Sequence, residues 1–353
     1  MKKKFVLITT CLQMGGVERA SVNTANALSE LNFDVYYISL FNKLHFFKPN
    51  PNVKIIEPQG FNEYNLSFIK TILYLRNNIK KINPNYILIF GKIYGAFLAI
   101  SLLGTHYSYY LSERSSPLYK WQFPFNWINR IAYSLNPPKG VIAQTSIAAE
   151  FQKKYYRNSI VDVIPNIVRE VKLYPDIQRE KILLAVGRLN DHLKGFDLLL
   201  KALFHLKNQD WMLHLAGGDG NTSNLKALAL NLGINHRIKF LGKITDIDLL
   251  YAKAGIFVIP SRSEGFPNAL LEAMSAGCCC VSFDFIAGPR DIIVDGYNGI
   301  LVERENYKKL AEVLDYLIEN EKLRNYLGNN AKKIIETHNG ELYKKKLLQF
   351  LNS

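Results

Sequence analysis

The clearest fold signal is IFVIPSRSEGFPNALLEAM, residues 256–274. The apolar run from Ile256 to Ile259 predicts a short buried strand, and the apolar spacing after Pro267 predicts a helix. The loop between them is polar, and ligands in open α/β sheets bind beyond the carboxyl ends of the strands. The stretch therefore predicts one strand–loop–helix unit of an α/β domain, with a candidate binding loop in its middle.

The same alternation of apolar runs and amphipathic stretches continues along most of the chain and restarts after Pro165-Asn166. This pattern is typical of parallel, doubly wound sheets and predicts two Rossmann-like α/β domains facing a cleft. A length of 353 residues, 48% of them hydrophobic, suffices for two domains. The predicted strands are residues 5–9, 34–40, 53–57, 86–90, 108–111, 140–144, 160–164, 182–186, 211–216, 237–241, 256–259 and 279–283.

Positive charge is concentrated in the first half of the chain. The net charge is +14, and residues 1–165 carry 19 Lys and Arg against 8 Asp and Glu, a net of +11. A basic half serves nucleic acid, an anionic membrane or a phosphorylated substrate. The chain has neither zinc-finger spacing nor an RNA-recognition motif, so nucleic acid is the least favoured of these partners.

The chain start and the cysteines indicate a cytoplasmic protein. The basic residues 1–4 lead directly into the first predicted strand, and no run of about 18 apolar residues exists. We therefore expect neither a signal peptide nor a spanning helix. The four cysteines lack CxxC spacing, so we expect small, buried, reduced thiols and no zinc at Cys11, Cys278, Cys279 and Cys280.

Two acids, Glu264 and Glu272, lie either side of the helix start in residues 256–274. Pro267 suits the first helical position, so we expect the amides of residues 268–270 to be free and to bind a diphosphate. Glu264 in the loop suits sugar hydroxyls, and Glu272, inside the helix, suits a second polyol such as ribose. The alternative is a pair of solvated helix-face charges.

The first predicted strand and helix are joined by a loop that contains Gly15-Gly16. Paired glycines let backbone approach a ligand closely. The loop is not GxGxxG, and no acid ends the second strand, so the dinucleotide fingerprint is absent. A binding loop and a tight packing turn both remain open.

The matching loop of the second half contains Gly187-Arg188 and Lys194-Gly195, and it leads into an amphipathic helix. Two cations at the mouth of a strand can clamp a diphosphate, Arg188 by its planar fork and Lys194 as a point charge. Either residue alone is more simply read as a solvated surface charge. His192 is expected to be an ordinary loop residue.

Taken together, these motifs resemble the retaining glycosyltransferases of family 4, which have the GT-B fold. The resemblance covers the whole chain and includes residues 163–166, 288–293 and 295–302. It implies an acceptor-binding domain at 1–166 and a nucleotide-sugar domain at 167–336. It also implies a terminal helix, 337–353, that returns to the first domain.

By this resemblance, Arg188 and Lys194 hold the donor diphosphate, Glu264 the transferred sugar and Glu272 the ribose. The paired glycines of the first domain close over the donor. The implied donor-binding set is Gly15, Gly16, Arg188, Lys194, Glu264, Gly265, Phe266, Pro267, Asn268, Ala269, Leu270 and Glu272.

One position departs from the family pattern. Many members carry a His-Asp pair after a central strand of the first domain, and this chain has Ser112-Glu113-Arg114 there. The segment is similar to a variant in bacterial relatives that extend lipid-linked oligosaccharides or surface polysaccharides, often with N-acetylated hexosamines. We assign Glu113 and Arg114 to acceptor or donor-sugar contacts, with a structural ion pair as the alternative.

The expected catalytic set is Glu264, Arg188, Lys194 and Glu113. We assign no Asp-x-Asp metal site in this chain, so departure of the diphosphate is expected to rely on Arg188, Lys194 and the helix dipole, without metal or other cofactor. The resemblance implies retention at the anomeric carbon, through front-face attack in which the departing phosphate takes the acceptor's proton.

The acceptor is expected to meet the basic half. Residues 118–130 mix aromatics with cations, and residues 67–81 form an amphipathic helix with a basic side. Such stretches suit an anionic headgroup layer, although core packing and solvated lysines are the ordinary alternative. A lipid diphosphate acceptor on the inner face of the cell membrane is consistent with the charge.

The sequence thus predicts a hexosyltransferase that moves a sugar from a nucleotide donor, UDP-linked by expectation, to a bacterial glycan such as capsule or lipopolysaccharide. The first alternative is a nonhydrolysing sugar-nucleotide epimerase of similar fold. The second is a basic nucleic-acid-binding protein. The base, sugar, linkage, acceptor and oligomeric state stay open.

Overall fold

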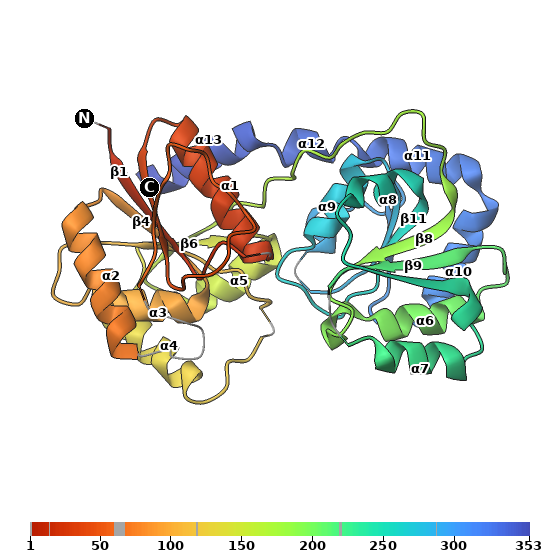
Figure 1. The fold of residues 1–353 in the computed structure, drawn as a ribbon, viewed down its shortest axis with the longest axis horizontal. Coiled ribbons are helices and arrows are strands. Elements are labelled where there is room, and N and C mark those ends of the chain that lie inside the picture. The colour runs from red at the N-terminus through yellow and green to blue at the C-terminus, as the bar shows by residue number, and fades with distance from the viewer. Residues whose placement is uncertain (1, 14, 60–67, 118, 219–220, 287) are drawn as a thin grey trace. The chain divides into compact units, whose positions relative to one another are not determined.

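The computed structural model describes residues 2–13, 15–59, 68–117, 119–218, 221–286 and 288–353 (Figure 1). The chain divides into two compact units. The first comprises the residues up to Ile167 together with Gly340–Ser353, and the second is Val168–Asn339.

The first unit contains a parallel sheet with the strand order β3-β2-β1-β4-β5-β6-β7. Its strands are β1 (Lys4–Thr9), β2 (Asp34–Ser39), β3 (Lys54–Ile56), β4 (Tyr86–Phe90), β5 (Tyr110–Ser112), β6 (Gly140–Ala143) and β7 (Ile160–Val163). Its helices are α1 (Gly16–Glu30), α2 (Phe68–Ile82), α3 (Lys92–Ser101), α4 (Phe125–Leu135), α5 (Ser146–Tyr155) and α13 (Gly340–Asn352).

Strand β1 is apolar from Phe5 to Ile8 because both of its faces are covered. Alternate residues of a strand point to opposite faces, and Phe5 and Leu7 pack in a core that includes α1 and α13. Val6 and Ile8 pack in a second core that includes α2 and α3. This double coverage is the property of parallel sheets that makes their central strands continuous hydrophobic runs.

Helix α13 belongs to the core of the first unit. Tyr343, Leu347 and Phe350 are buried in the same cluster as the β1 side chains. The Tyr343 hydroxyl lies 2.6 Å from the Thr24 hydroxyl of α1, and the Tyr110 hydroxyl donates to the Leu351 carbonyl at 3.2 Å. The last 14 residues therefore complete a hydrophobic layer that the first 167 residues leave open.

The second unit contains a parallel sheet with the order β10-β9-β8-β11-β12-β13. Its strands are β8 (Glu180–Val186), β9 (Met212–Ala216), β10 (Ile238–Gly242), β11 (Ala254–Ile259), β12 (Cys279–Phe283) and β13 (Ile300–Val302). Its helices are α6 (Phe196–His205), α7 (Ser223–Asn231), α8 (Ile247–Lys253), α9 (Asn268–Ser275), α10 (Tyr307–Glu319), α11 (Glu321–Ala331) and α12 (Ile334–Thr337), with short 3-10 turns η1 (His192–Lys194), η2 (Asn235–Arg237) and η3 (Pro289–Asp291).

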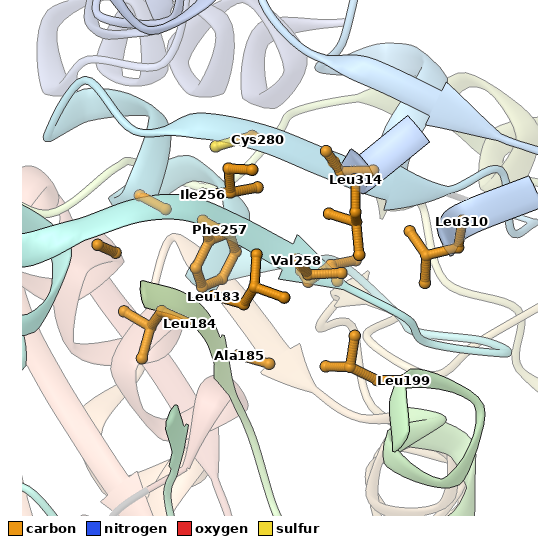
Figure 2. Packing of buried hydrophobic residues seen from close by; sticks show 14 of the residues in the cluster. Leu183, Leu184, Ala185, Leu199, Ile256, Phe257, Val258, Cys280, Leu310 and Leu314 are labelled. Atoms are coloured by element: carbon orange, nitrogen blue, oxygen red, sulfur yellow. The ribbon is translucent and has the colours of Figure 1, made fainter. Parts of the chain in front are cut away.

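The core of this unit forms around the paired strands β8 and β11. Figure 2 shows Leu183 of β8 and Phe257 of β11 packed beside Val258, with Leu310 and Leu314 of α10 nearby. The cysteines belong to the cores as well: all four are buried free thiols, as expected from their spacing. Burial raises the pKa of Cys279 to about 12, so this thiol stays protonated.

Each sheet has one switch point, where the chain stops adding strands on one side of the sheet and begins to add them on the other. In the first sheet the reversal lies between β1 and β4, and in the second between β8 and β11. Ligands of doubly wound sheets bind outside the carboxyl ends of the strands at such points. The loops that follow these four strands are therefore where binding residues are expected.

The structure confirms the predicted fold class of two parallel, Rossmann-like α/β sheets. Each of the 12 predicted strands is present, with ends shifted by two residues or fewer. Strand β13 was not among the predicted strands. Within the described ranges, no helix has the length and apolar character needed to cross a membrane.

Candidate functional site

The loop after β8 is built to lie against the end of β11. Asp191 caps the turn η1 by accepting the Leu193 amide at 3.0 Å. Gly195 then adopts φ +67°, and a Cβ at this position would clash with the Pro260 carbonyl oxygen. Only glycine combines this left-handed conformation with so close an approach, so the sequence Lys194-Gly195 fixes where Lys194 lies.

We expect Gly195→Ala to lower the free energy of unfolding of this unit by about 2 kcal/mol or more, because the added methyl group meets both a positive φ and the Pro260 backbone. Thermal unfolding measures the loss. The matched control is Gly233→Ala, since Gly233 has a similar φ of +70° but open space around its Cβ position. Equal losses in the two variants would contradict the packing explanation.

Lys194 and Glu264 form an ion pair at the switch point of the second sheet. The Lys194 Nζ lies 2.8 Å from Glu264 Oε2, and the Ser261 hydroxyl donates to Glu264 Oε1 at 2.6 Å. Both charged side chains are largely buried. The loops that follow β8 and β11 therefore bring together a cation and a carboxylate that has two hydrogen-bonding partners. The sequence did not predict this contact between Lys194 and Glu264.

Arg188, the other predicted cation, is in a different state. Its side chain is 75% exposed and pairs with Asp191 at 2.8 Å. An exposed pair of this kind contributes little to stability, so the guanidinium can leave Asp191 at small cost. The structure thus holds Lys194 in place and leaves Arg188 available at the surface of the same loop.

Arg262 fastens these loops together, a role the sequence analysis did not assign. Its two terminal nitrogens donate to the two carboxylate oxygens of Asp197 at 2.7 Å each, and Nη1 also donates to the His192 carbonyl at 2.9 Å. Burial opposes ionisation of Asp197, but the Arg262 guanidinium outweighs it and lowers the pKa of that carboxyl. His192, predicted as an ordinary loop residue, is the first residue of the 3-10 turn η1 within this loop.

Glu272 is buried within a charge network. Its Oε2 accepts the Tyr251 hydroxyl at 3.1 Å and Arg169 Nη2 at 3.3 Å. Arg169 also pairs with Asp248. Partial burial lowers the pKa of Arg169, but the carboxylates of Asp248 and Glu272 outweigh this effect and raise the pKa above its ordinary value. Glu272 is therefore a buried carboxylate held by two donors and not the solvated helix-face charge of the alternative interpretation.

The start of α9 corrects one prediction. The helix begins at Asn268, and Pro267 is its cap, with a non-helical ψ of 74°. The Asn268 amide donates to the Phe266 carbonyl and the Leu270 amide to the Pro267 carbonyl, both at 3.0 Å. These two amides are engaged in the turn and are not free, because the chain tightens before the helix starts. Gly265 lies in the preceding loop and Ala269 in the first helical turn.

Gly288 packs against this turn from a distant segment. Its φ is +156°, and a Cβ there would lie 2.8 Å from Pro267 Cδ. The Phe266 ring is buried and lies 6.4 Å from the His338 ring. The segment that contains Gly288 and Pro289 therefore packs against the candidate binding loop at Pro267.

In the first unit, Gly15 caps helix α1 in an extended conformation. A Cβ at Gly15 would clash with the Glu18 carboxylate, which folds back over the helix start, and Glu18 Oε1 accepts the Thr10 hydroxyl at 2.6 Å. Gly16 is the first helical residue. Both glycines follow β1, at the switch point of the first sheet.

Glu113 follows β5 and is buried among partners that the sequence analysis missed. Its Oε2 accepts the Tyr156 hydroxyl at 2.7 Å, and Lys92 Nζ lies 3.7 Å away. Lys92 also lies over the Tyr155 ring at 3.6 Å. Burial lowers the pKa of Lys92, and Glu113 opposes that shift. The position of Lys92 directly after the strand end at Phe90-Gly91 was the signal that could have revealed it.

Arg114 points to different partners. Its Nε donates to the Ser112 hydroxyl at 2.7 Å, its Nη1 bonds the Asn166 side chain, and it lies over the Phe90 ring at 5.0 Å. Burial lowers its pKa to about 10, with Tyr343 of α13 acting in the opposite direction. The alternative of a mutual Glu113–Arg114 ion pair is wrong, because each residue has its own partners.

Among the residues that the structure describes, no three His, Cys, Asp or Glu side chains are grouped to hold a metal ion.

Comparison with known protein families gives a match to the part of the second unit that contains the candidate site. Residues 173–334 match the family model described as glycosyl transferases group 1. An uncharacterized glycosyltransferase of Haemophilus influenzae is 28% identical over 353 residues, with 96% of each chain covered. The GalNAc-alpha-(1->4)-GalNAc-alpha-(1->3)-diNAcBac-PP-undecaprenol alpha-1,4-N-acetyl-D-galactosaminyltransferase of Campylobacter jejuni is 28% identical, with 94% of this chain and 93% of the relative covered.

A solved structure extends the likeness to both units. The structure of Anabaena HepE in complex with UDP matches with a TM-score of 0.82 and covers 99% of each chain, at 16% identity. At that identity the match shows a shared fold, with a parallel sheet in each of two units.

Proposed function

We propose that the chain, a glycosyltransferase of the GT-B fold whose residues 173–334 match the group 1 family model, transfers a hexosyl group from a UDP-sugar to a lipid-linked glycan acceptor, with retention of configuration. The observation that carries the proposal is the Lys194–Glu264–Ser261 cluster at the switch point between β8 and β11. A fixed cation beside a carboxylate suits a ligand with a phosphate end and a hydroxyl-rich end.

The donor is assigned to the loops of the second unit. Lys194 and Arg188 would bind the diphosphate, Lys194 from a fixed position and Arg188 by leaving its exposed pair with Asp191. Glu264 would accept hydrogen bonds from hydroxyls of the transferred sugar, and Glu272 from the ribose. The first turn of α9 would add its positive dipole end.

The chemistry needs charge stabilisation more than proton relays. The bond between the anomeric carbon and the diphosphate oxygen breaks, and the acceptor oxygen bonds to that carbon on the same face. The acceptor's proton passes to the departing phosphate oxygen. Lys194 and Arg188 would stabilise the negative charge that develops on this oxygen, the role that a metal ion has in other enzymes. We therefore propose that transfer is independent of metal.

The names of similar proteins favour the donor and acceptor classes. The Campylobacter jejuni relative is named for N-acetylgalactosamine transfer onto an undecaprenol-linked glycan, and the Anabaena structure contains UDP. An N-acetylhexosamine donor and a polyprenyl-diphosphate acceptor, in the assembly of bacterial surface polysaccharide or oligosaccharide, are the corresponding proposals for this chain.

We propose that Glu113 of the first unit contacts the acceptor. It lies at the carboxyl end of β5 with Lys92 and Tyr156 as its partners. The cation and the hydroxyl hold this carboxylate at the strand end, where it would accept a hydrogen bond from a sugar hydroxyl. Arg114, in contrast, is proposed as a structural residue, because Ser112 and Asn166 bond its guanidinium within the protein.

The test offers a panel of nucleotide sugars together with lipid-linked acceptors, with and without EDTA, and follows nucleotide release and product mass. We expect release of UDP only when the acceptor is present, one added hexosyl mass, an α-anomeric product from an α-linked donor, and equal rates in EDTA. Turnover of the donor without acceptor would favour the epimerase instead. Loss of activity in EDTA would overturn the metal-independent mechanism.

We also propose that the first unit lies against the anionic inner face of the membrane through α4. Trp127, Ile131 and Leu135 form an exposed apolar stripe one turn apart on this helix, with Arg130 exposed beside it. Apolar side chains flanked by cations are typical of interfacial helices. Exposed apolar residues of α2, Ile69 and Leu73, belong to the same unit.

Replacing Ile131 by Asp is expected to weaken binding to vesicles of anionic lipid about tenfold, because a buried aliphatic side chain contributes roughly 1.5–3 kcal/mol. Cosedimentation measures the partition. The matched control is Ile335→Asp in the second unit, since Ile335 and Ile131 are both 51% exposed. Equal losses in both variants, or none in Ile131→Asp, would contradict a membrane role of α4.

A further inference from the structure

A buried charge network joins Glu272 to the first residues of the second unit. Arg169 follows Val168, where this unit begins, and its Nη2 lies 3.3 Å from Glu272 Oε2. The guanidinium also binds both carboxylate oxygens of Asp248, with Nη1 donating to Oδ2 at 2.9 Å and Nη2 donating to Oδ1. Asp248 also accepts the Lys172 amide at 2.9 Å. Arg169 is thus held by Asp248 in an orientation that presents a donor to Glu272.

Tyr251 supplies a second donor to the same oxygen. Its hydroxyl lies 3.1 Å from Glu272 Oε2, and the ring is fully buried against Phe257 at 5.7 Å between centroids. Two donors on one carboxylate oxygen fix both the position of the group and its rotation about the last side-chain bond. Burial raises the pKa of Tyr251 well above its ordinary value, so the hydroxyl remains a donor.

We propose that Arg169 is a positioning residue for recognition of the donor ribose: with Tyr251 it holds the Glu272 carboxylate in the one orientation that accepts the ribose hydroxyls. The inference rests on the proposed assignment of Glu272 to the ribose. An unpaired buried carboxylate takes up a proton or changes rotamer. A prearranged acceptor loses less entropy on binding than a mobile one. Removing Arg169 therefore weakens the ribose contact and leaves the diphosphate contacts at Lys194.

The experiment measures binding of nucleoside diphosphates and their 2′-deoxy counterparts by calorimetry, using UDP and dUDP, ADP and dADP, and GDP and dGDP. The readout is the ratio of the two dissociation constants for the base that binds best. We expect the wild-type protein to prefer the ribonucleotide by about tenfold or more, as for a hydrogen bond to a charged group. Arg169→Met should reduce the ratio to within about threefold of one, and Arg169→Lys should restore part of it.

The matched control is Arg179→Met in the same unit. Arg179 donates to the backbone carbonyls of Tyr251 at 3.0 Å and Ala254 at 2.7 Å, next to the same helix and strand. Its loss should lower thermal stability and leave the ribose preference at the wild-type value. Should Arg169→Met fail to fold, Tyr251→Phe tests the same carboxylate and is expected to reduce the ratio in part.

The outcomes separate this inference from the proposed function. A folded Arg169→Met protein with the wild-type ratio overturns the inference, as does a wild-type protein that binds a nucleotide without preferring ribose. Failure of UDP alone, with a ribose preference for another base that Arg169→Met abolishes, overturns the UDP donor and supports the inference. Failure of every nucleoside diphosphate to bind overturns both.

Discussion

Lys194→Ala is expected to lower kcat for transfer by about 10²–10³-fold, the usual effect of removing one fixed group that stabilises charge in a transition state. Lys194, in the loop after β8, has its Nζ 2.8 Å from Glu264 and is held in place by Gly195. Alanine removes the cation from the departing diphosphate. It also leaves Glu264 with Ser261 as its described donor, so sugar and diphosphate contacts both suffer.

The fold should survive this change. The Lys194 side chain retains 20% exposure, so solvent screens part of the pair, and the midpoint of thermal unfolding is expected to move by only a few degrees. Lys201→Ala in α6 is the control, since Lys201 lies over the Tyr307 ring, 5.7 Å from its centroid, and has no assigned role at the site. A near-normal kcat in Lys194→Ala, with full thermal stability, would remove the site from the second unit.

The strands were predictable because a strand that is buried on both faces appears in the sequence as a continuous run of apolar residues. Val258 and its neighbours in β11 show this, since every residue of β11 is buried. The start of α9 was less predictable: proline usually occupies the first helical position, yet Pro267 has ψ 74° and the helix starts one residue later. The packing of Gly288 on Pro267, from 21 residues downstream, is invisible to a local rule.

The residues of the candidate site were found as single positions, but their pairings were not. Lys194 pairs with Glu264 across 70 residues of sequence, and Arg169 with Glu272 across 103. Periodicity and spacing report on neighbours within a few turns. They do not report which strand ends become adjacent when the order of the sheet reverses at β8 and β11. Arg262, Lys92 and Tyr156 were overlooked for the same reason.

The second large effect is expected for Glu264→Gln. Glutamine keeps the shape of the side chain and can retain the Ser261 hydrogen bond, but it loses the ion pair with Lys194. Its amide oxygen is also a weaker hydrogen-bond acceptor than the carboxylate. A hydrogen bond to a charged group contributes roughly 1.5–3 kcal/mol, so we expect kcat/KM for the donor to fall about 10- to 100-fold. The matched control is Glu305→Gln, because Glu305 pairs with Arg262 at 3.2 Å and is more exposed.

The double variant Lys194→Ala/Glu264→Gln distinguishes a functional pair from two independent residues. If Lys194 and Glu264 act as one unit, the first substitution already removes most of what the second would remove, so the combined loss in kcat/KM is smaller than the product of the separate losses. Initial rates at subsaturating donor for the four proteins close the cycle. Strict multiplication of the two losses would mean that the 2.8 Å contact has no part in transfer, and that Lys194 and Glu264 bind different parts of the donor separately.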